Sequence, residues 1–131
     1  MIFSVGDILL DQTVPGADRS QIEQFSQGTE DPNPIHVDEA FAKSAGFPTV
    51  LQQGPMTTAH FARLLTEQVG PNRLRTLDIN FTAPVFPEEP LRLKATVERV
   101  DSQIQCTLTA AKSDGTLTAR GTASIALSEG S

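Results

Sequence analysis

Apolar and polar residues alternate along the second half of the chain. The alternation covers four segments, and a period of two predicts strands with one buried face. Turn-forming residues separate the segments, and the links between them are short. Consecutive strands with short links predict an antiparallel sheet, because parallel neighbours need longer crossovers. The four segments are residues 77–81, 91–97, 104–110 and 119–127.

A helical pattern of apolar residues precedes these strands, over residues 54–69. Pro55 fits the first turn of a helix, where its missing N–H is not needed, and Gly70 with Pro71 predicts the end. The apolar positions occupy more than one face, so we expect the helix to be wrapped by other structure. One long helix and an antiparallel sheet predict an α+β architecture.

Two shorter helices are predicted earlier in the chain, over residues 18–28 and 39–45. Asp18 and Asp38 precede them at positions where an aspartate side chain caps a helix. Phe41 is expected to face inward from the second helix. We expect the two helices to form a cover over the core.

The stretch Asp-Pro-Asn-Pro-Ile-His, from Asp31 to His36, places a carboxylate near an imidazole. Pro32 and Pro34 disfavour the α conformation of the residues before them, so we expect an extended, non-helical segment. Asp31 and His36 are then candidates for an acid/base pair. The alternative from the residues alone is that Asp31 and Asn33 shape a turn and His36 is a packed loop histidine.

Length and composition predict one globular domain over residues 1–131, with 38% hydrophobic and 20% charged residues. The formal net charge of -6 argues against a nucleic-acid-binding surface. It does not exclude an anionic ligand held by a local basic cluster. We expect neither a membrane span nor secretion, and therefore a cytoplasmic protein. The single cysteine, Cys106, is expected in the core of a strand.

Several blocks of the sequence together resemble the MaoC-like dehydratases, the group that includes the R-specific enoyl-CoA hydratases. The Asp-x-Asn-Pro-Ile-His block is the most specific of them. The resemblance implies a hot-dog fold, in which an antiparallel sheet wraps a long helix, and a homodimer. It also implies a coenzyme A thioester as substrate, with no metal or redox cofactor. The blocks are residues 25–38, Ala45-Gly46-Phe47, Gln53-Gly54-Pro55-Met56 and residues 81–87.

The resemblance assigns roles to individual residues. Asp31 and His36 match the family's catalytic pair, with Asp31 as the base that activates water and His36 as its partner in moving the proton. Gly54 matches the oxyanion-hole donor; the alternative is a plain glycine at a helix start. Asn33 is expected to shape the loop that holds the pair.

Two positions depart from the family pattern. The family commonly has a histidine directly before the helix glycine, where this chain has Gln53. Gln53 can support the site by hydrogen bonding but cannot titrate. Some R-specific hydratases also carry a serine where this chain has Ala62, and Thr57 and Thr58 are candidates for replacing that hydroxyl.

The remaining candidates concern the ligand and its surroundings. His60, on the long helix, is expected to be a satisfied histidine and not a catalytic one. The acyl group is expected to run along apolar residues of the cover and the long helix, with Phe41, Phe47, Val50 and Leu51 as the main contributors. Candidates for binding the coenzyme's phosphates are Lys43, Arg63, Arg73 and Arg75.

The predicted activity is reversible hydration of a trans-2-enoyl-CoA to the (R)-3-hydroxyacyl-CoA. Three alternatives stay open: a (3R)-hydroxyacyl dehydratase acting on an acyl carrier protein, a noncatalytic acyl-thioester-binding protein, and a thioesterase. The retained Asp31 and His36 argue against the noncatalytic protein, and the Asp-x-Asn-Pro-Ile-His block argues against the thioesterase. The sequence does not identify the acyl chain.

Overall fold

The computed structural model describes residues 2–30 and 33–128. Along the chain, the long helix comes after one strand and before the other four. In chain order the elements are β1 (Ile8–Val14), α1 (Arg19–Gly28), the 3-10 helix η1 (Pro34–His36), α2 (Glu39–Ser44), α3 (Gly54–Val69), β2 (Leu74–Phe81), β3 (Leu91–Val100), β4 (Gln103–Ala111) and β5 (Leu117–Ala126).

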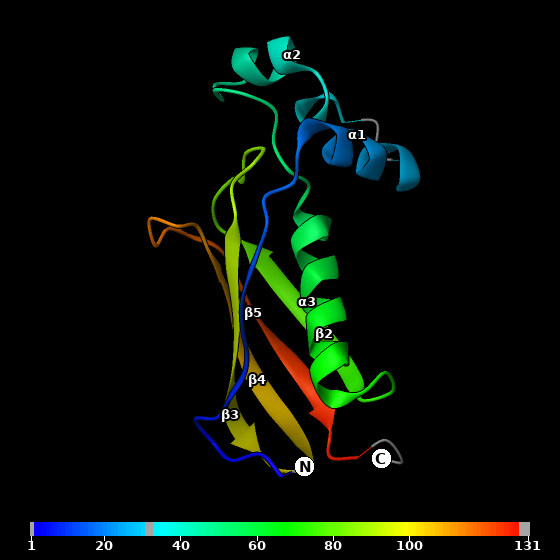
Figure 1. The fold of residues 1–131 in the computed structure, drawn as a ribbon, viewed down its shortest axis with the longest axis vertical. Coiled ribbons are helices and arrows are strands. Elements are labelled where there is room, and N and C mark those ends of the chain that lie inside the picture. Colours follow the sequence, from blue (N-terminus) through cyan, green and yellow to red (C-terminus); the bar gives the residue numbers. More distant parts are fainter. Residues whose placement is uncertain (1, 31–32, 129–131) are drawn as a thin grey trace.

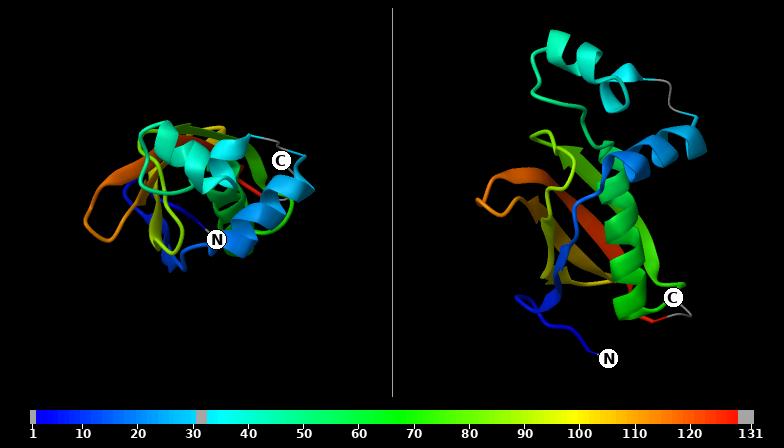
Figure 2. Two further views of the ribbon diagram at one scale, coloured as in Figure 1. Left: turned by 90° about the horizontal axis from the view of Figure 1, so that it is seen from above. Right: turned by 45° about the horizontal axis from the view of Figure 1, so that its top comes forward.

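The five strands form one antiparallel sheet in the order β1-β3-β4-β5-β2. The sheet is curved, and α3 lies along its concave side (Figures 1 and 2). The predicted α+β architecture and the predicted α3 are therefore confirmed, and the four predicted strands are present.

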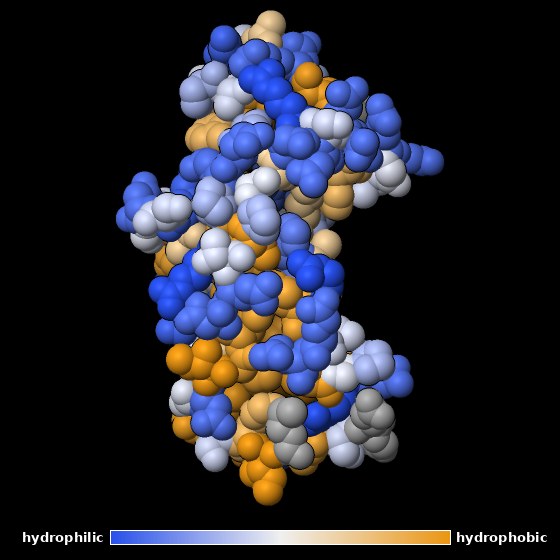
Figure 3. Space-filling model, in the orientation of Figure 1, coloured by the Kyte–Doolittle hydropathy of each residue, from blue (hydrophilic) through white to orange (hydrophobic). Residues whose placement is uncertain are grey.

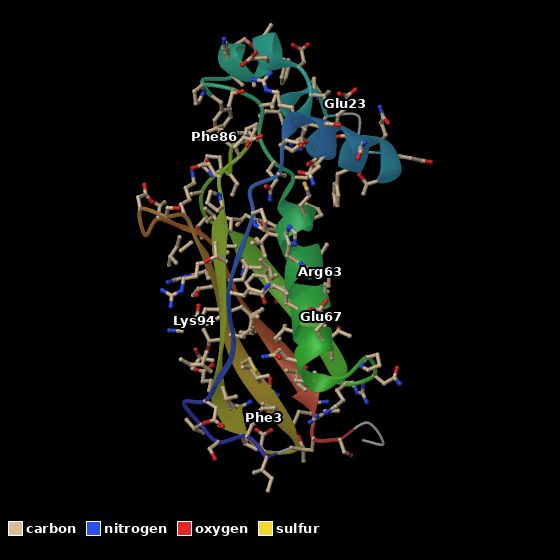
Figure 4. All side chains as sticks on the ribbon, in the orientation of Figure 1. Phe3, Glu23, Arg63, Glu67, Phe86 and Lys94 are labelled. Carbon is tan, nitrogen blue, oxygen red and sulfur yellow. The ribbon has the colours of Figure 1, made fainter. Side chains whose placement is uncertain are left out.

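The core lies between α3 and the concave face of the sheet. Phe61, Leu64 and Leu65 of α3 are buried there with strand residues such as Leu93 and Leu108. The opposite side of α3 is exposed and carries charged residues such as Arg63, which is ion-paired with Glu67 (Figure 4). Within this chain the sheet therefore encloses one side of the helix.

The sequence pattern did not predict β1. Its neighbouring residues Leu9 and Leu10 are both buried, and its pairing with β3 shifts register between Ile8 and Leu10. A bulge of this kind breaks the alternation of period two, which is the signal that identifies a strand.

The caps predicted for α1 and α2 are confirmed. Asp18 and Gln21 form a reciprocal capping box, and the Asp38 side chain accepts a hydrogen bond from the Phe41 N–H. The inward orientation predicted for Phe41 is wrong, because its residue surface is 44% exposed. Ala42 is the buried residue of this short helix instead.

The helices α1, η1 and α2 lie together beyond one end of the sheet, above the N-terminus of α3 (Figures 1 and 2). The predicted cover is therefore displaced from the core and stands over the start of the long helix. This position follows from the segment 51–53, which leads directly from the cover into α3. The cover consequently borders the helix end that the resemblance assigns to substrate binding.

Arg73 is buried and donates hydrogen bonds to three backbone carbonyls, those of Val69, Ala126 and Leu127. It joins the C-terminal end of α3 to the end of β5. The suggested phosphate-binding role of Arg73 is therefore wrong, since its guanidinium is used inside the fold.

Within residues 2–30 and 33–128, no helix is both long enough and apolar enough to cross a membrane.

Candidate active site

The segment that carries His36 is a short 3-10 turn. Asn33 has extended backbone angles, and its side-chain oxygen accepts a hydrogen bond of 3.1 Å from the Ile35 N–H. Pro34 occupies the first position of the turn, where a proline is tolerated. The predicted non-helical segment is therefore wrong for Pro34 to His36, whereas the loop-shaping geometry expected of Asn33 is present.

The imidazole of His36 is oriented by a backbone carbonyl. Its Nδ1 lies 2.8 Å from the Leu51 oxygen. A carbonyl oxygen can only accept a hydrogen bond, so Nδ1 carries the proton in this contact. In the neutral ring the lone pair is then on Nε2, which is the atom able to accept a proton.

Hydrogen bonds tie the segment before α3 to both of its neighbours. The Leu51 N–H donates to the Ile35 oxygen at 3.0 Å, and the Gln52 N–H donates to the Val85 oxygen at 2.8 Å. The first bond attaches this segment to η1, and the second attaches it to the loop after β2. Together they fix His36 relative to the start of α3.

Gly54 begins α3, where the first N–H groups of a helix have no partner within the helix. Among the described residues, no acceptor is bonded to its N–H. A Cβ at this position would lie 2.8 Å from the ring of Phe81, so a larger residue here would displace that ring. The helix dipole favours negative charge at this N–H.

A pocket of about 390 Å³ opens beside Gly54. One wall comes from the start of α3 and the residues before it, and the other comes from the end of β2 and the loop that follows. Gln52, Gln53, Gly54 and Thr57 form the first wall, and Phe81, Thr82, Ala83, Pro84, Val85 and Thr118 form the second.

The second wall was not predicted as part of the site. Its residues 81–85 belong to one of the blocks that suggested the family, and this block was the available signal. Thr118 lies far away in sequence and is brought to the pocket by β5, so no local pattern could have identified it.

Gln53 connects α1 to the start of α3. Its residue surface is 1% exposed, and its side-chain nitrogen donates 2.8 Å hydrogen bonds to the Ile22 oxygen and to the Ser26 hydroxyl. Its side-chain oxygen is buried and has no hydrogen-bond partner among the described residues. The amide thus has the supporting geometry expected for Gln53.

Replacing Gln53 with alanine should lower the free energy of unfolding by about 2 kcal/mol, because it removes packing and leaves the buried Ser26 hydroxyl without its partner. Urea denaturation followed by circular dichroism measures this change. Gln24→Ala is the matched control, since Gln24 is an exposed glutamine on α1 and its loss should change stability by less than about 0.5 kcal/mol. Equal stability of the two variants would contradict the bridging role.

Asp31 lies outside the described residues, as does Pro32. The role predicted for Asp31 therefore remains a prediction from the sequence. Of the four residues predicted to contact the acyl group, Val50 is buried and Leu51 accepts the His36 bond. Neither these two nor Phe41 and Phe47 line the pocket beside Gly54, so their role also remains a prediction.

His60 lies in a separate hollow between α1 and α3, together with Phe25, Met56 and Arg63. The surface is indented below α1 in the region where these helices meet (Figure 3). Burial, and secondarily the charge of Arg63, lower the pKa of His60. His60 therefore lies outside the pocket at Gly54, as expected for a histidine without a catalytic role.

Cys106 is buried in β4, as predicted. Burial raises the pKa of its thiol to about 11, so the thiol stays protonated at neutral pH. This protonation state agrees with a core residue and not with a nucleophile.

The profile of the MaoC like domain matches residues 8–119, and the chain belongs to this family. The match extends from β1 to the start of β5 and includes η1, Gly54 and both walls of the pocket. The family comprises hydratases and dehydratases, and its fold is the hot-dog fold predicted from the sequence.

Individual relatives agree with this assignment. The peroxisomal hydratase-dehydrogenase-epimerase of Saccharomyces cerevisiae is 40% identical over 63 residues, which are 48% of this chain and 7% of that protein. The chain thus spans a small part of that relative.

Solved structures share the fold. The (R)-hydratase from A. caviae involved in PHA biosynthesis has a TM-score of 0.84 and 23% identity, with 95% of this chain and 97% of that chain covered. The HadBC complex, a (3R)-hydroxyacyl-ACP dehydratase from Mycobacterium tuberculosis, has a TM-score of 0.76 and 16% identity, with 92% and 96% covered.

Proposed function

We propose that this protein is an R-specific enoyl-CoA hydratase, which reversibly adds water to a trans-2-enoyl-CoA to give the (R)-3-hydroxyacyl-CoA. Two observations carry the proposal. The His36 ring is oriented by the oxygen of Leu51, three residues before α3, and the Gly54 N–H at the start of α3 has no acceptor among the described residues and borders a pocket of about 390 Å³. Membership of the MaoC-like family supports the reaction class. We further propose a homodimer as the working form, as the family resemblance implies.

The reaction needs a base for water, a proton at C2 and a donor for the thioester oxygen. Asp31 takes a proton from water while the water oxygen bonds to C3, and His36 holds that water through Nε2. Negative charge moves onto the thioester oxygen, where the Gly54 N–H stabilises it. Return of the proton to C2 completes the addition. Asp31 and His36 act as a coupled pair, so the proton belongs to both during the cycle.

A second candidate is dehydration of a (3R)-hydroxyacyl group on an acyl carrier protein. It is the same chemistry in reverse on another carrier, and the fold shared with the HadBC dehydratase favours it as the alternative. The residues would keep their roles in this reaction. The carrier is decided by contacts outside the pocket beside Gly54.

Incubation of the purified protein with crotonyl-CoA and longer enoyl-CoAs tests the proposal. We expect loss of the absorbance of the conjugated thioester, and a 3-hydroxyacyl product of R configuration by chiral chromatography. Turnover of the acyl-carrier substrate alone would favour the dehydratase, and release of free thiol would indicate a thioesterase. Absence of turnover across all chain lengths would refute the proposal.

A further inference from the structure

The polar groups of the pocket beside Gly54 differ in how far the fold already uses them. The Thr82 hydroxyl donates to the Leu117 oxygen at 2.9 Å, and the Thr118 hydroxyl donates to the Ala110 oxygen at 3.4 Å. These two threonines therefore stabilise the pocket wall. Their hydroxyl protons are not available to a ligand.

Thr57 differs from them. It lines the pocket, its residue surface is 2% exposed, and its hydroxyl has no hydrogen-bond partner among the described residues. Its oxygen is not among the fully buried side-chain atoms that lack a partner, so the hydroxyl is accessible from the pocket, where a ligand can pair with it. The side-chain amide of Gln52, on the same wall, also lacks a partner among the described residues. Ordering it would fix three side-chain torsions, whereas threonine has a single, stiff χ1.

The first turn of α3 has few other backbone N–H groups available to a ligand. Pro55 has no N–H, and the Met56 N–H donates to the Gln53 oxygen at 3.1 Å. The Gly54 N–H borders the pocket and has no acceptor among the described residues. Residues three apart lie on one face of a helix, so Thr57 stands directly behind Gly54 on the face that lines the pocket.

We propose that the Thr57 hydroxyl is a second donor of the site and hydrogen-bonds the carbonyl oxygen of the bound thioester together with the Gly54 N–H. The inference rests on the proposed function for the identity of the ligand. The hydroxyl donates a hydrogen bond and transfers no proton. It supplies a donor that Pro55 lacks, at a position five residues closer to Gly54 than Ala62.

Thr57→Val removes the hydroxyl and keeps the shape of the side chain. We expect kcat for crotonyl-CoA hydration to fall about a hundredfold, the effect of losing one oxyanion donor. KM should change little, because the bond strengthens as negative charge develops on the oxygen. Thr57→Ser should retain most of the activity, since it keeps the donor.

Thr58→Val is the matched control. Thr58 is the next residue of α3 and does not line the pocket, so this variant should match the wild type. A Thr57→Val variant with wild-type kcat, or a Thr57→Ser variant as impaired as Thr57→Val, would overturn the role of the hydroxyl.

Infrared spectroscopy separates this inference from the proposed function. Hexanoyl-CoA labelled with a heavy carbon isotope at the thioester carbonyl cannot be hydrated, and a hydrogen bond lowers its stretching frequency. We expect a lower frequency when it is bound to the wild type than to Thr57→Val. Equal frequencies would overturn the inference. The measurement needs no turnover, so it tests the hydrogen bond even if the wild type hydrates no enoyl-CoA and the proposed function fails.

Discussion

Asp31→Asn should lower kcat for hydration of crotonyl-CoA by about a hundredfold to ten-thousandfold, the range found when a general acid/base group is removed. Asparagine has nearly the same shape as aspartate but cannot take a proton from water. The thioester should therefore still bind, and KM should change much less than kcat. Initial rates over a range of substrate concentrations measure both constants.

Asp38→Asn provides the control for this experiment. The chemical change is the same, but Asp38 caps α2, and asparagine caps a helix about as well as aspartate. We expect wild-type activity in this variant. Full activity in Asp31→Asn would refute the assignment of Asp31 as the base.

Gly121→Ala should lower the free energy of unfolding by about 3 kcal/mol, the upper part of the usual range for overpacking. A Cβ at Gly121 would lie 2.0 Å from the Asp78 oxygen and 3.0 Å from the Cα of Ile79. Both atoms belong to the backbone of β2, so the contact can be relieved only by moving that strand. Because β2 ends at Phe81 beside Gly54, we also expect hydratase activity to fall.

Gly28→Ala makes the same substitution at a position where a Cβ would meet nothing within 4 Å. Its effect on stability should stay within about 1 kcal/mol, and its sign should be stabilising because alanine favours the helix. Urea denaturation of the two variants compares them directly. A loss in Gly121→Ala no larger than that in Gly28→Ala would contradict the close approach of β2 and β5.

Features that depend on neighbours in sequence could be predicted at the site. The Asp38 cap is an example, and so is Asn33, which was expected to shape its loop and caps η1. The extended conformation expected for Pro34 to His36 was wrong because Pro34 also fits the first position of a turn. The local rules for proline allow both an extended segment and a turn. In the turn that formed, the Ile35 oxygen accepts a hydrogen bond from the Leu51 N–H.

Features that depend on distant segments could not be predicted. Phe41 was expected inside, but α2 lies above the start of α3 and its phenylalanine faces outward. Gln53 was identified as a supporting residue from the family pattern, whereas its partners Ile22 and Ser26 became visible only in the fold. Sequence spacing shows which residues share one face of a helix, but it does not show which other element packs against that face.

The sequence alone determined the long helix, four strands and the family, because each depends on periodicity or on a contiguous motif. It also identified Asp31, His36 and Gly54 as candidates. The tertiary structure decided which groups surround Gly54, since the pocket joins α3 to β2 and β5, which are distant in sequence. It also decided that the Thr57 hydroxyl faces this pocket without a hydrogen-bond partner among residues 2–30 and 33–128, because such partners are brought together only when the chain folds.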